Sequence, residues 1–456
     1  MMAPKIDVEV PTFLTFFALS FGSIITTNYI IYASCYVTLG HNKTICGLLG
    51  TNFTNNETME LETEVQPYAT RVTLTSAVID ATFAPFLCFF LGSWSDRYGR
   101  KPVLLLSIAG TTLSNLMKAA ITIMPNVSPW YTLISLIPGC MTGGIAATIS
   151  AILCYITDTT RDKERGIKMY MFEGIIAVTT VLASLTAPLT LQTFGYPPVF
   201  FISFLSGVIS FLYVFIFLPE SVQNVQQQDK LKNFFNIALL MTTMKTVFKR
   251  REHYIRATLL VTLTLLTFII FSFLGRESVV FLYLRNRFAW NLTDCTFYIS
   301  VMSVITIFGG VLSLLLLYKL LRLKEITILM ISLSTCCVCS IFQGLASTNI
   351  QFYVAGSFNF LNGTISPMAR SLLSKLINAE DIGKIFSILI CLEIVGGLSG
   401  NLFYTYIYNK TLTTFPQAFY YITSGIYLID IGLLVVIIVL KRYSGQLSYA
   451  EMSSDA

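Results

Sequence analysis

Residues 92–101 read Gly92-Ser93-Trp94-Ser95-Asp96-Arg97-Tyr98-Gly99-Arg100-Lys101 and lie between two long apolar stretches. These stretches, 70–94 and 102–124, are each long enough to cross a bilayer as an α-helix. Asp96 falls at the end of the first stretch, Gly99 permits a tight turn, and cations surround the turn. The segment predicts two membrane-crossing helices joined by a short charged loop.

The whole chain repeats this pattern of apolar runs and polar loops. Of its 456 residues, 54% are hydrophobic and 12% are charged, and the mean hydropathy is +0.70. A soluble domain has about 25% charged residues, so a soluble enzyme, a disordered chain and a fibrous protein are excluded. Long apolar runs also argue against an alternating β-barrel. We predict an all-α polytopic membrane protein with twelve spans near 11–36, 70–94, 102–124, 130–156, 167–193, 197–218, 256–284, 295–318, 325–346, 350–376, 384–409 and 413–440.

The loop charges predict an orientation. With both termini cytoplasmic, 22 of the 30 Lys and Arg residues fall on the inner side and 4 fall in outer loops. Cytoplasmic loops carry such an excess, so the net charge of +6 reflects membrane topology and gives no reason to expect a nucleic-acid partner. Three Asn-x-Thr sequons cluster in the outer loop 37–66 and predict N-glycosylation there; their acceptors are Asn42, Asn52 and Asn56.

A long polar, then basic loop divides the spans into six plus six. We predict an N-terminal half over 1–218, a cytoplasmic linker over 219–255, a C-terminal half over 256–440 and a cytoplasmic tail over 441–456. Paired six-span halves are the layout of many secondary transporters. The chain shows no phosphate-binding Gly-Lys loop and no histidine-based metal set, so we expect neither an enzyme nor a metal or other cofactor.

The charged loop resembles the G-x-x-x-D-R-x-G-R-[KR] signature of the major facilitator superfamily. The matching residues form the predicted conformational gate motif: Gly92, Asp96, Arg97, Gly99, Arg100 and Lys101. Such a cluster can pair with carboxylates and helix C-termini of the opposite half and lock one conformation. Leu218-Pro219-Glu220-Ser221 also resembles a superfamily signature, whereas the equivalent loop of the second half, 319–324, lacks the pattern.

Several segments resemble solute carrier family 46, the proton-coupled folate transporter family, with a likeness to insect members at Gln66-Pro67-Tyr68. They are Pro367-Met-Ala-Arg370-Ser-Leu-Leu-Ser374-Lys375-Leu, Gly383-Lys-Ile-Phe386, Asp158, Met171-Phe-Glu173-Gly, and Tyr283 with Trp290. The resemblance implies a major facilitator fold and inward, proton-coupled transport of bulky organic anions. Folates, muropeptides, cyclic dinucleotides and conjugated drugs are the substrates associated with its members.

The chain departs from the folate-transporting branch in span 7. That branch has a histidine that influences proton binding, and this chain has Phe273 at the aligned position, followed by Arg276 and Glu277. Folate is therefore a less favoured substrate. The stretch Glu393-Ile-Val-Gly-Gly397 is more similar to the lysosomal branch of the family.

Ionisable residues inside the spans need a partner or a water-filled cavity. Glu173 and Arg370 both lie about 9 Å from the inner ends of spans 5 and 10 at 1.5 Å per residue. The resemblance implies that Glu173 is a proton-coupling carboxylate and that Arg370 takes part in substrate or proton binding. A purely structural charge pair between helices is the alternative.

Further intramembrane residues join these two as candidates. Asp80 and Glu393 lie near mid-depth of spans 2 and 11, and two such carboxylates raise each other's proton affinity if they approach each other across the halves. We add Glu277 as a proton-coupling candidate and Lys118, Arg276 and Tyr155 as candidates for lining the substrate cavity.

Two features lie outside the spans. Cys46 and Cys295 are predicted on the oxidising outer side, where disulfides persist, and the family resemblance implies a bridge between their two loops; Cys35 is a competing partner. The tail contains Tyr449-Ala-Glu-Met452, the spacing that endocytic adaptors bind as an extended strand. Tyr449 and Met452 then indicate a sorting motif on a disordered tail and cycling between the plasma membrane and endolysosomes.

These features favour a proton-coupled symporter that works by alternating access and uses the proton as its coupling ion. An uncoupled facilitative carrier of the same fold and a non-transporting membrane receptor are the alternatives. Loss of the intramembrane charges or a large folded loop would have favoured the receptor.

Overall fold

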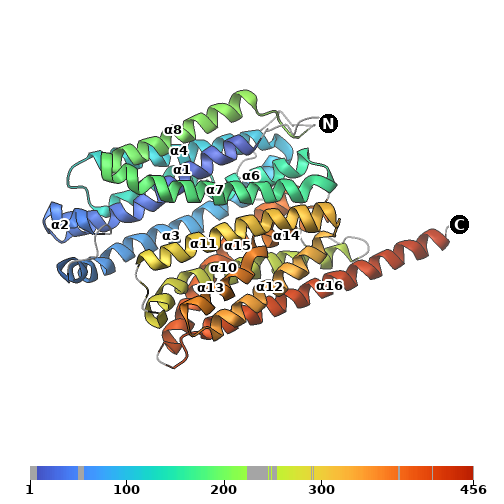
Figure 1. The fold of residues 1–456 in the computed structure, drawn as a ribbon. Coiled ribbons are helices and arrows are strands. Elements are labelled where there is room, and N and C mark those ends of the chain that lie inside the picture. The colour runs from blue at the N-terminus through green and yellow to red at the C-terminus, as the bar shows by residue number, and fades with distance from the viewer. Residues whose placement is uncertain are drawn as a thin grey trace. The chain divides into compact units, whose positions relative to one another are not determined.

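The computed structural model describes residues 8–49, 56–222, 245, 248, 254–288, 290, 292–377, 381–412 and 414–454. Helices are the only regular secondary structure over these ranges (Figure 1). The chain up to the predicted linker forms α1 (Glu9–Ala33), the π-helix η1 (Ser34–Thr38), α2 (Lys43–Leu48), α3 (Asn56–Tyr98), α4 (Arg100–Ile123), the 3₁₀-helix η2 (Pro129–Leu136), α5 (Ile137–Met141), α6 (Gly144–Thr159), α7 (Asp162–Phe194) and α8 (Tyr196–Phe217).

The chain after the linker is equally helical. It forms α10 (Ile255–Phe288), α11 (Leu292–Ser313), the π-helix η3 (Leu314–Leu320), α12 (Glu325–Leu345), α13 (Asn349–Ser357), the 3₁₀-helix η4 (Phe358–Thr364), α14 (Ile365–Ser374), α15 (Ile382–Thr411) and α16 (Ala418–Ser454).

Contacts between residues divide the chain into two compact units, 1–155 with 175–236 and 156–174 with 237–456. The end of α6 and the first turns of α7 thus group with the second unit, a detail that the expected six-plus-six division lacks. In the first unit α8 packs against α1 and α4; in the second, α10 packs against α15 and α16, and α12 against α16. The segment 156–174 brings the carboxylate of Glu173 into the second unit.

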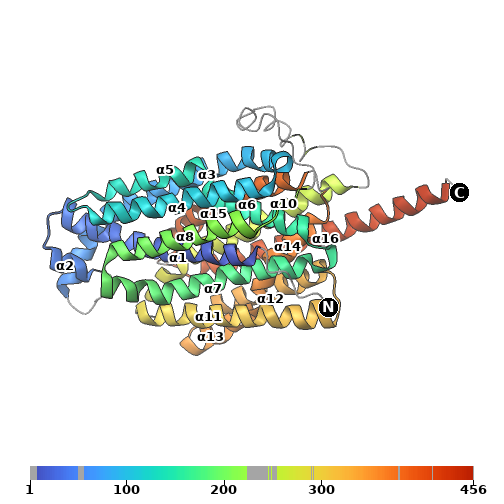
Figure 2. The same cartoon turned by 90° about the horizontal axis from the view of Figure 1, so that it is seen from above.

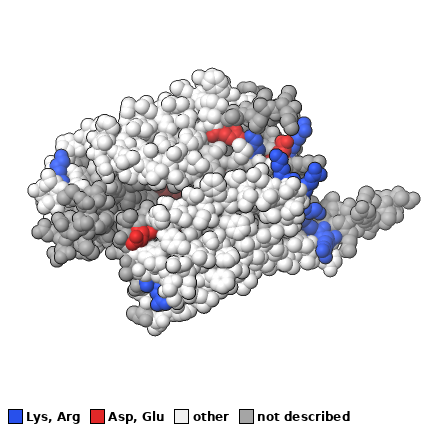
Figure 3. All heavy atoms as spheres, in the orientation of Figure 1, with Lys and Arg blue, Asp and Glu red and all other residues white. Residues whose placement is uncertain are grey.

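Eleven helices within the described residues have the length and apolar composition to cross a membrane. On the face drawn in Figure 3 the helix sides carry few charged side chains, and Lys and Arg gather near helix ends. This distribution agrees with a protein whose helix sides face lipid. The chain is a multi-pass membrane protein.

The tenth predicted span, 350–376, is not one continuous helix. Its residues are divided among α13, η4 and α14, with Asn362-Gly363 in the 3₁₀ segment and Pro367 in the first turn of α14. The fourth span is also interrupted, because Gly143 before α6 and Gly144 at its first position have positive φ values of +80° and +50°. Interrupted helices at corresponding places of two repeats are the usual location of binding sites in secondary transporters.

Two terminal regions differ from the expectation. The outer loop expected over 37–66 is largely helical, because α2 occupies part of it and α3 begins at Asn56 instead of near residue 70. The tail expected to be disordered is helical as well, since α16 continues to Ser454 and extends past the other helices of its unit (Figure 2). Residues 441–454 contain no proline and only one glycine, so nothing in their sequence ends the helix earlier.

Candidate functional site

A group of largely buried charges in the second unit surrounds Arg370 on α14. Its Nη1 donates to Oε1 of Glu173 on α7 at 2.5 Å, and its Nη2 donates to Oε2 and Oε1 of Glu393 on α15 at 2.8 and 3.0 Å. Two consecutive helices, α14 and α15, and the distant α7 therefore meet at one guanidinium. We call Arg370, Glu173 and Glu393 the charge triad.

The two carboxylates of the charge triad have different surroundings. The side chains of Arg370 and Glu393 are 7% and 8% exposed, whereas that of Glu173 is 28% exposed. Both oxygens of Glu393 accept from Arg370, but Glu173 uses only Oε1, which also accepts from the hydroxyl of Ser366 at 3.1 Å. Glu173 Oε2 has no partner among the described residues.

The charges of the triad do not balance. One guanidinium with two ionised carboxylates carries a net charge of −1, and a charge inside a membrane protein is costly unless it is compensated. One proton on either carboxylate makes the group neutral. Arg370 Nε is also buried without an acceptor within the described residues, so the guanidinium keeps unused donor capacity.

The interruption of the tenth span determines where the Arg370 guanidinium lies. Arg370 follows η4 by less than two turns of α14, and residues 367–374 of that helix are buried. Pro367 in the first turn lacks an N–H that would be unpaired there in any case. Arg370 thus lies on α14, a short and largely buried helix that directly follows the 3₁₀-helix η4.

The structure confirms that Glu173 and Arg370 contact each other, as their equal predicted depths suggested. Arg370 is also a partner of Glu393, and this contact was not predicted from the sequence. The contact between Arg370 and Glu393 could have been predicted, because the inner ends of spans 10 and 11 follow each other in the sequence. Ser366 was missed, although its spacing of four residues before Arg370 puts both on one helix face.

Arg276 and Glu277 on α10 form a second pair, Nη2 to Oε1 at 2.9 Å. The Arg276 side chain is 7% exposed, whereas that of Glu277 is 43% exposed. The guanidinium carbon of Arg276 lies 5.8 Å from the centre of the Phe273 ring. Asp430 on α16 is fully buried, and its two oxygens have no partner within the described residues. Burial of a carboxyl group without a hydrogen-bond partner is costly.

The candidates of the first unit are more dispersed. Asp80 on α3 accepts from the Cys140 thiol at 3.5 Å, and Lys118 on α4 is within electrostatic range of Asp80. Tyr155 on α6 is buried at 2% exposure. The approach of Asp80 to Glu393 across the halves stays a prediction.

The gate motif forms a hydrogen-bonded turn in the first unit. Asp96 pairs with Arg100 at 2.6 Å, and Glu220 Oε1 and Oε2 accept from the backbone N–H groups of Arg100 and Lys101 at 2.7 and 3.2 Å. Glu220 therefore caps the first turn of α4 and stabilises its N-terminal dipole. Gly99 has φ +106°, and a Cβ there would overlap the Glu220 carboxylate. Gly92 and Arg97 lie in the last turns of α3.

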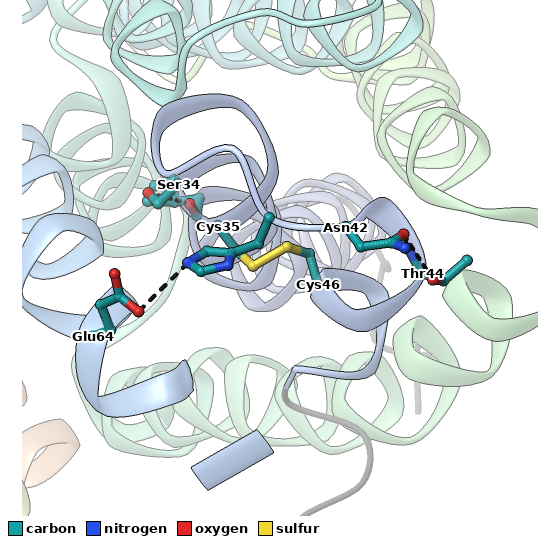
Figure 4. The surroundings of a disulfide bond; sticks show 8 residues. Ser34, Cys35, Asn42, Thr44, Cys46 and Glu64 are labelled. Atoms are coloured by element: carbon teal, nitrogen blue, oxygen red, sulfur yellow. Dashed lines mark hydrogen bonds and ion pairs between the residues drawn. A yellow bond between two sulfur atoms is a disulfide. The ribbon is translucent and has the colours of Figure 1, made fainter. Parts of the chain in front are cut away.

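The predicted disulfide between Cys46 and Cys295 is wrong. Cys46 is bonded to Cys35, the competing partner, with a Cα–Cα distance of 5.7 Å (Figure 4). Cys35 in η1 and Cys46 in α2 are brought together because the chain reverses at Gly40, which has φ +76°. The bridge packs against Leu49 and Val65, and His41 beside it pairs with Glu64 at 3.4 Å. Cys295 is buried in α11 of the second unit.

The sequons have mixed positions. Asn42 is exposed, and its Oδ1 accepts from the backbone N–H and hydroxyl of Thr44, which leaves the amide nitrogen available (Figure 4). Asn52 lies outside the described residues, and Asn56 is the first residue of α3. Tyr449 and Met452 lie on α16, and their side chains are outside the described part of the chain.

The chain belongs to the Major Facilitator Superfamily, because that family's model matches residues 12–401. It is a transporter of this class and, more closely, a member of solute carrier family 46. It is 31% identical to "Probable peptidoglycan muropeptide transporter SLC46" of Drosophila melanogaster over 95% of this chain and 85% of that protein.

Two further comparisons agree. The chain is 25% identical to "Lysosomal proton-coupled steroid conjugate and bile acid symporter SLC46A3" of Rattus norvegicus, over 82% of this chain and 80% of that protein. The crystal structure of the human organic anion transporter MFSD10 covers 95% of this chain and 100% of its own at a TM-score of 0.68 and 16% identity, which confirms the major facilitator fold.

Proposed function

We propose that this transporter couples the inward movement of bulky organic anions to protons through the charge triad. The observation that supports the proposal most strongly is the sharing of one guanidinium by two carboxylates, one of them partly exposed. With both carboxylates ionised, Arg370 is occupied by Glu173 and Glu393. A proton on Glu173 weakens its hold on Nη1 and makes that donor available to an anion.

Glu173 is the proposed proton acceptor, and Glu393 is the proposed positioning residue. Glu173 Oε2 has no donor among the described residues and the Glu173 side chain is 28% exposed, whereas both Glu393 oxygens are engaged. Protonation of Glu173 and binding of the anion then favour each other. The proton removes the negative charge that Glu173 holds against Arg370, and the anion supplies a negative charge to the same guanidinium. This reciprocity is the thermodynamic basis of symport. On the neutral side, loss of the proton lets Glu173 compete for Arg370 and expel the anion.

The substrate class follows from the relatives and from the cation. Muropeptides carry carboxylates on a bulky polar body, and the Drosophila relative is named for them. Bile acids and steroid conjugates, for which the rat relative is named, carry an anionic group on an apolar body. We propose muropeptide-like anions first, bile acid-like anions second and folates third, because Phe273 stands where the folate branch has histidine.

An uptake experiment tests the coupling and the substrate together. Cells that express the chain are given a labelled muropeptide, a labelled bile acid or labelled folic acid at acidic and at neutral external pH. We expect faster muropeptide uptake at acidic pH, accompanied by cytosolic acidification. Uptake that is equal at both pH values, with no acidification, would indicate the uncoupled carrier.

The remaining roles are part of the same proposal. Asp80, Glu277, Lys118, Arg276 and Tyr155 are assigned to the wider proton and substrate path, and the gate motif to the conformational change. An endolysosomal or plasma membrane address gives an acidic outer or lumenal side, which drives anions into the cytosol. For the adaptor to bind Tyr449 and Met452 as an extended strand, the end of α16 has to unwind.

A further inference from the structure

The hydroxyl of Ser366 differs from the other helical hydroxyl groups around it. The hydroxyls of Ser357 and Ser374 donate to carbonyl groups three residues earlier in the chain, at 2.6 and 2.8 Å. This is the ordinary arrangement for serine and threonine in membrane helices. Ser366 instead donates across to Oε1 of Glu173 on α7.

The acceptor of this bond is the oxygen that Arg370 also uses. Glu173 Oε1 accepts from Arg370 Nη1 at 2.5 Å and from Ser366 at 3.1 Å, and Glu173 Oε2 accepts from no described residue. Both donors lie on α14, four residues apart. One helix face therefore fixes one carboxylate oxygen and leaves the other open to a proton.

We infer that Ser366 is a positioning residue that sets the pH at which Glu173 takes up the coupling proton. This inference rests on the proposed function of the charge triad. A hydroxyl that donates to a carboxylate stabilises the ionised form and so opposes protonation. Ser366 thereby favours release of the proton on the neutral side of the membrane, and it directs the incoming proton to Oε2.

Within the described residues, the hydrogen bonds and the ion pair of Glu173 come from α14. Arg370 and Ser366 approach from α14, and Glu393 approaches from α15 on the far side of the guanidinium. On α7 itself, the Tyr170 hydroxyl donates to the Ile307 carbonyl on α11, away from Glu173. Ser366 is the uncharged donor of this group, so its hydrogen bond to Glu173 does not itself change with pH.

Replacing Ser366 gives a shift of predictable sign and size. A hydrogen bond to a charged group contributes enough to change proton affinity about tenfold, which corresponds to about one pH unit. Ser366→Ala should therefore raise the midpoint of Glu173 protonation by about one pH unit. Ser366→Thr keeps the hydroxyl and should stay near wild type. Ser366→Cys retains the size and a weak donor, so its midpoint should lie between those of the wild type and Ser366→Ala.

The same helix offers a matched control. Ser371 is buried on α14, and its hydroxyl has no partner within the described residues. Ser371→Ala removes an equal group from the same helix without touching Glu173. A midpoint shift common to both alanine variants would indicate a general loosening of α14, and it would reject a specific role for Ser366.

Infrared difference spectroscopy measures the midpoint without any substrate. The purified full-length protein is titrated with acid, and the C=O band of the protonated carboxyl is isolated by subtracting Glu173→Gln. We expect the band to titrate at higher pH in Ser366→Ala than in wild type or Ser371→Ala. An unchanged or lowered midpoint in both Ser366→Ala and Ser366→Cys overturns the inference while the triad proposal stands. If the wild type minus Glu173→Gln difference shows no titrating band, the triad proposal itself fails.

Discussion

Replacing Arg370 by alanine should remove the cation that holds Glu173 and Glu393 together. Two carboxylates, one 8% and one 28% exposed, would then face each other without a partner. Breaking a buried ion pair by removing one partner costs about 3–5 kcal/mol. Most of this cost comes from Glu393, because the more exposed Glu173 can be solvated. We expect a clear loss of thermal stability and almost no uptake.

The double variant Arg370→Ala with Glu393→Ala separates stability from transport. Removing both charges takes away the uncompensated carboxylate, so the stability should largely return, while uptake stays lost because the anion-binding cation is absent. Thermal stability of the detergent-solubilised protein is followed by size-exclusion chromatography after heating, together with uptake of a labelled muropeptide. Wild-type stability in the single variant, or a double variant no more stable than the single one, would refute the reasoning.

Three further predictions concern other parts of the chain. Gly99→Ala should destabilise the turn between α3 and α4 by about 1–2 kcal/mol or more, because φ is +106° and the Cβ overlaps Glu220; a thermal stability equal to that of wild type would argue against this contact. Non-reducing peptide mapping should recover one peptide pair joined through Cys35 and Cys46, and a link to Cys295 would contradict the structure. Tyr449→Ala should raise the surface-biotinylated fraction if the tail is a sorting motif, and an unchanged fraction would leave the tail without that role.

The membrane class and most helix positions could be predicted because they depend on local composition. Spans of apolar residues must satisfy their backbone hydrogen bonds internally, which makes them helices wherever they occur. The tenth span was harder: its apolar length predicts one helix, but Asn362-Gly363 and Pro367 interrupt it. A glycine or proline in a membrane helix is often tolerated, so its presence alone does not locate a break.

The charge triad could be predicted in part. Depth along the spans paired Glu173 with Arg370, since charges at the same depth can meet. The expected approach of Asp80 to Glu393 relied on the general layout of the fold and stays a prediction. The contact of Glu393 with an arginine on the adjacent span satisfies a buried carboxylate directly. For Cys46, the nearer cysteine, eleven residues away, closes the bridge.

The central claim, that Glu173 couples the proton to the anion, is tested most directly by Glu173→Gln reconstituted in proteoliposomes. Glutamine keeps the size of the side chain and imitates the protonated state. We predict that exchange of labelled for unlabelled muropeptide persists and no longer depends on pH, while net uptake driven by an inward proton gradient is lost. Gradient-driven uptake with the pH dependence of the wild type would contradict the account.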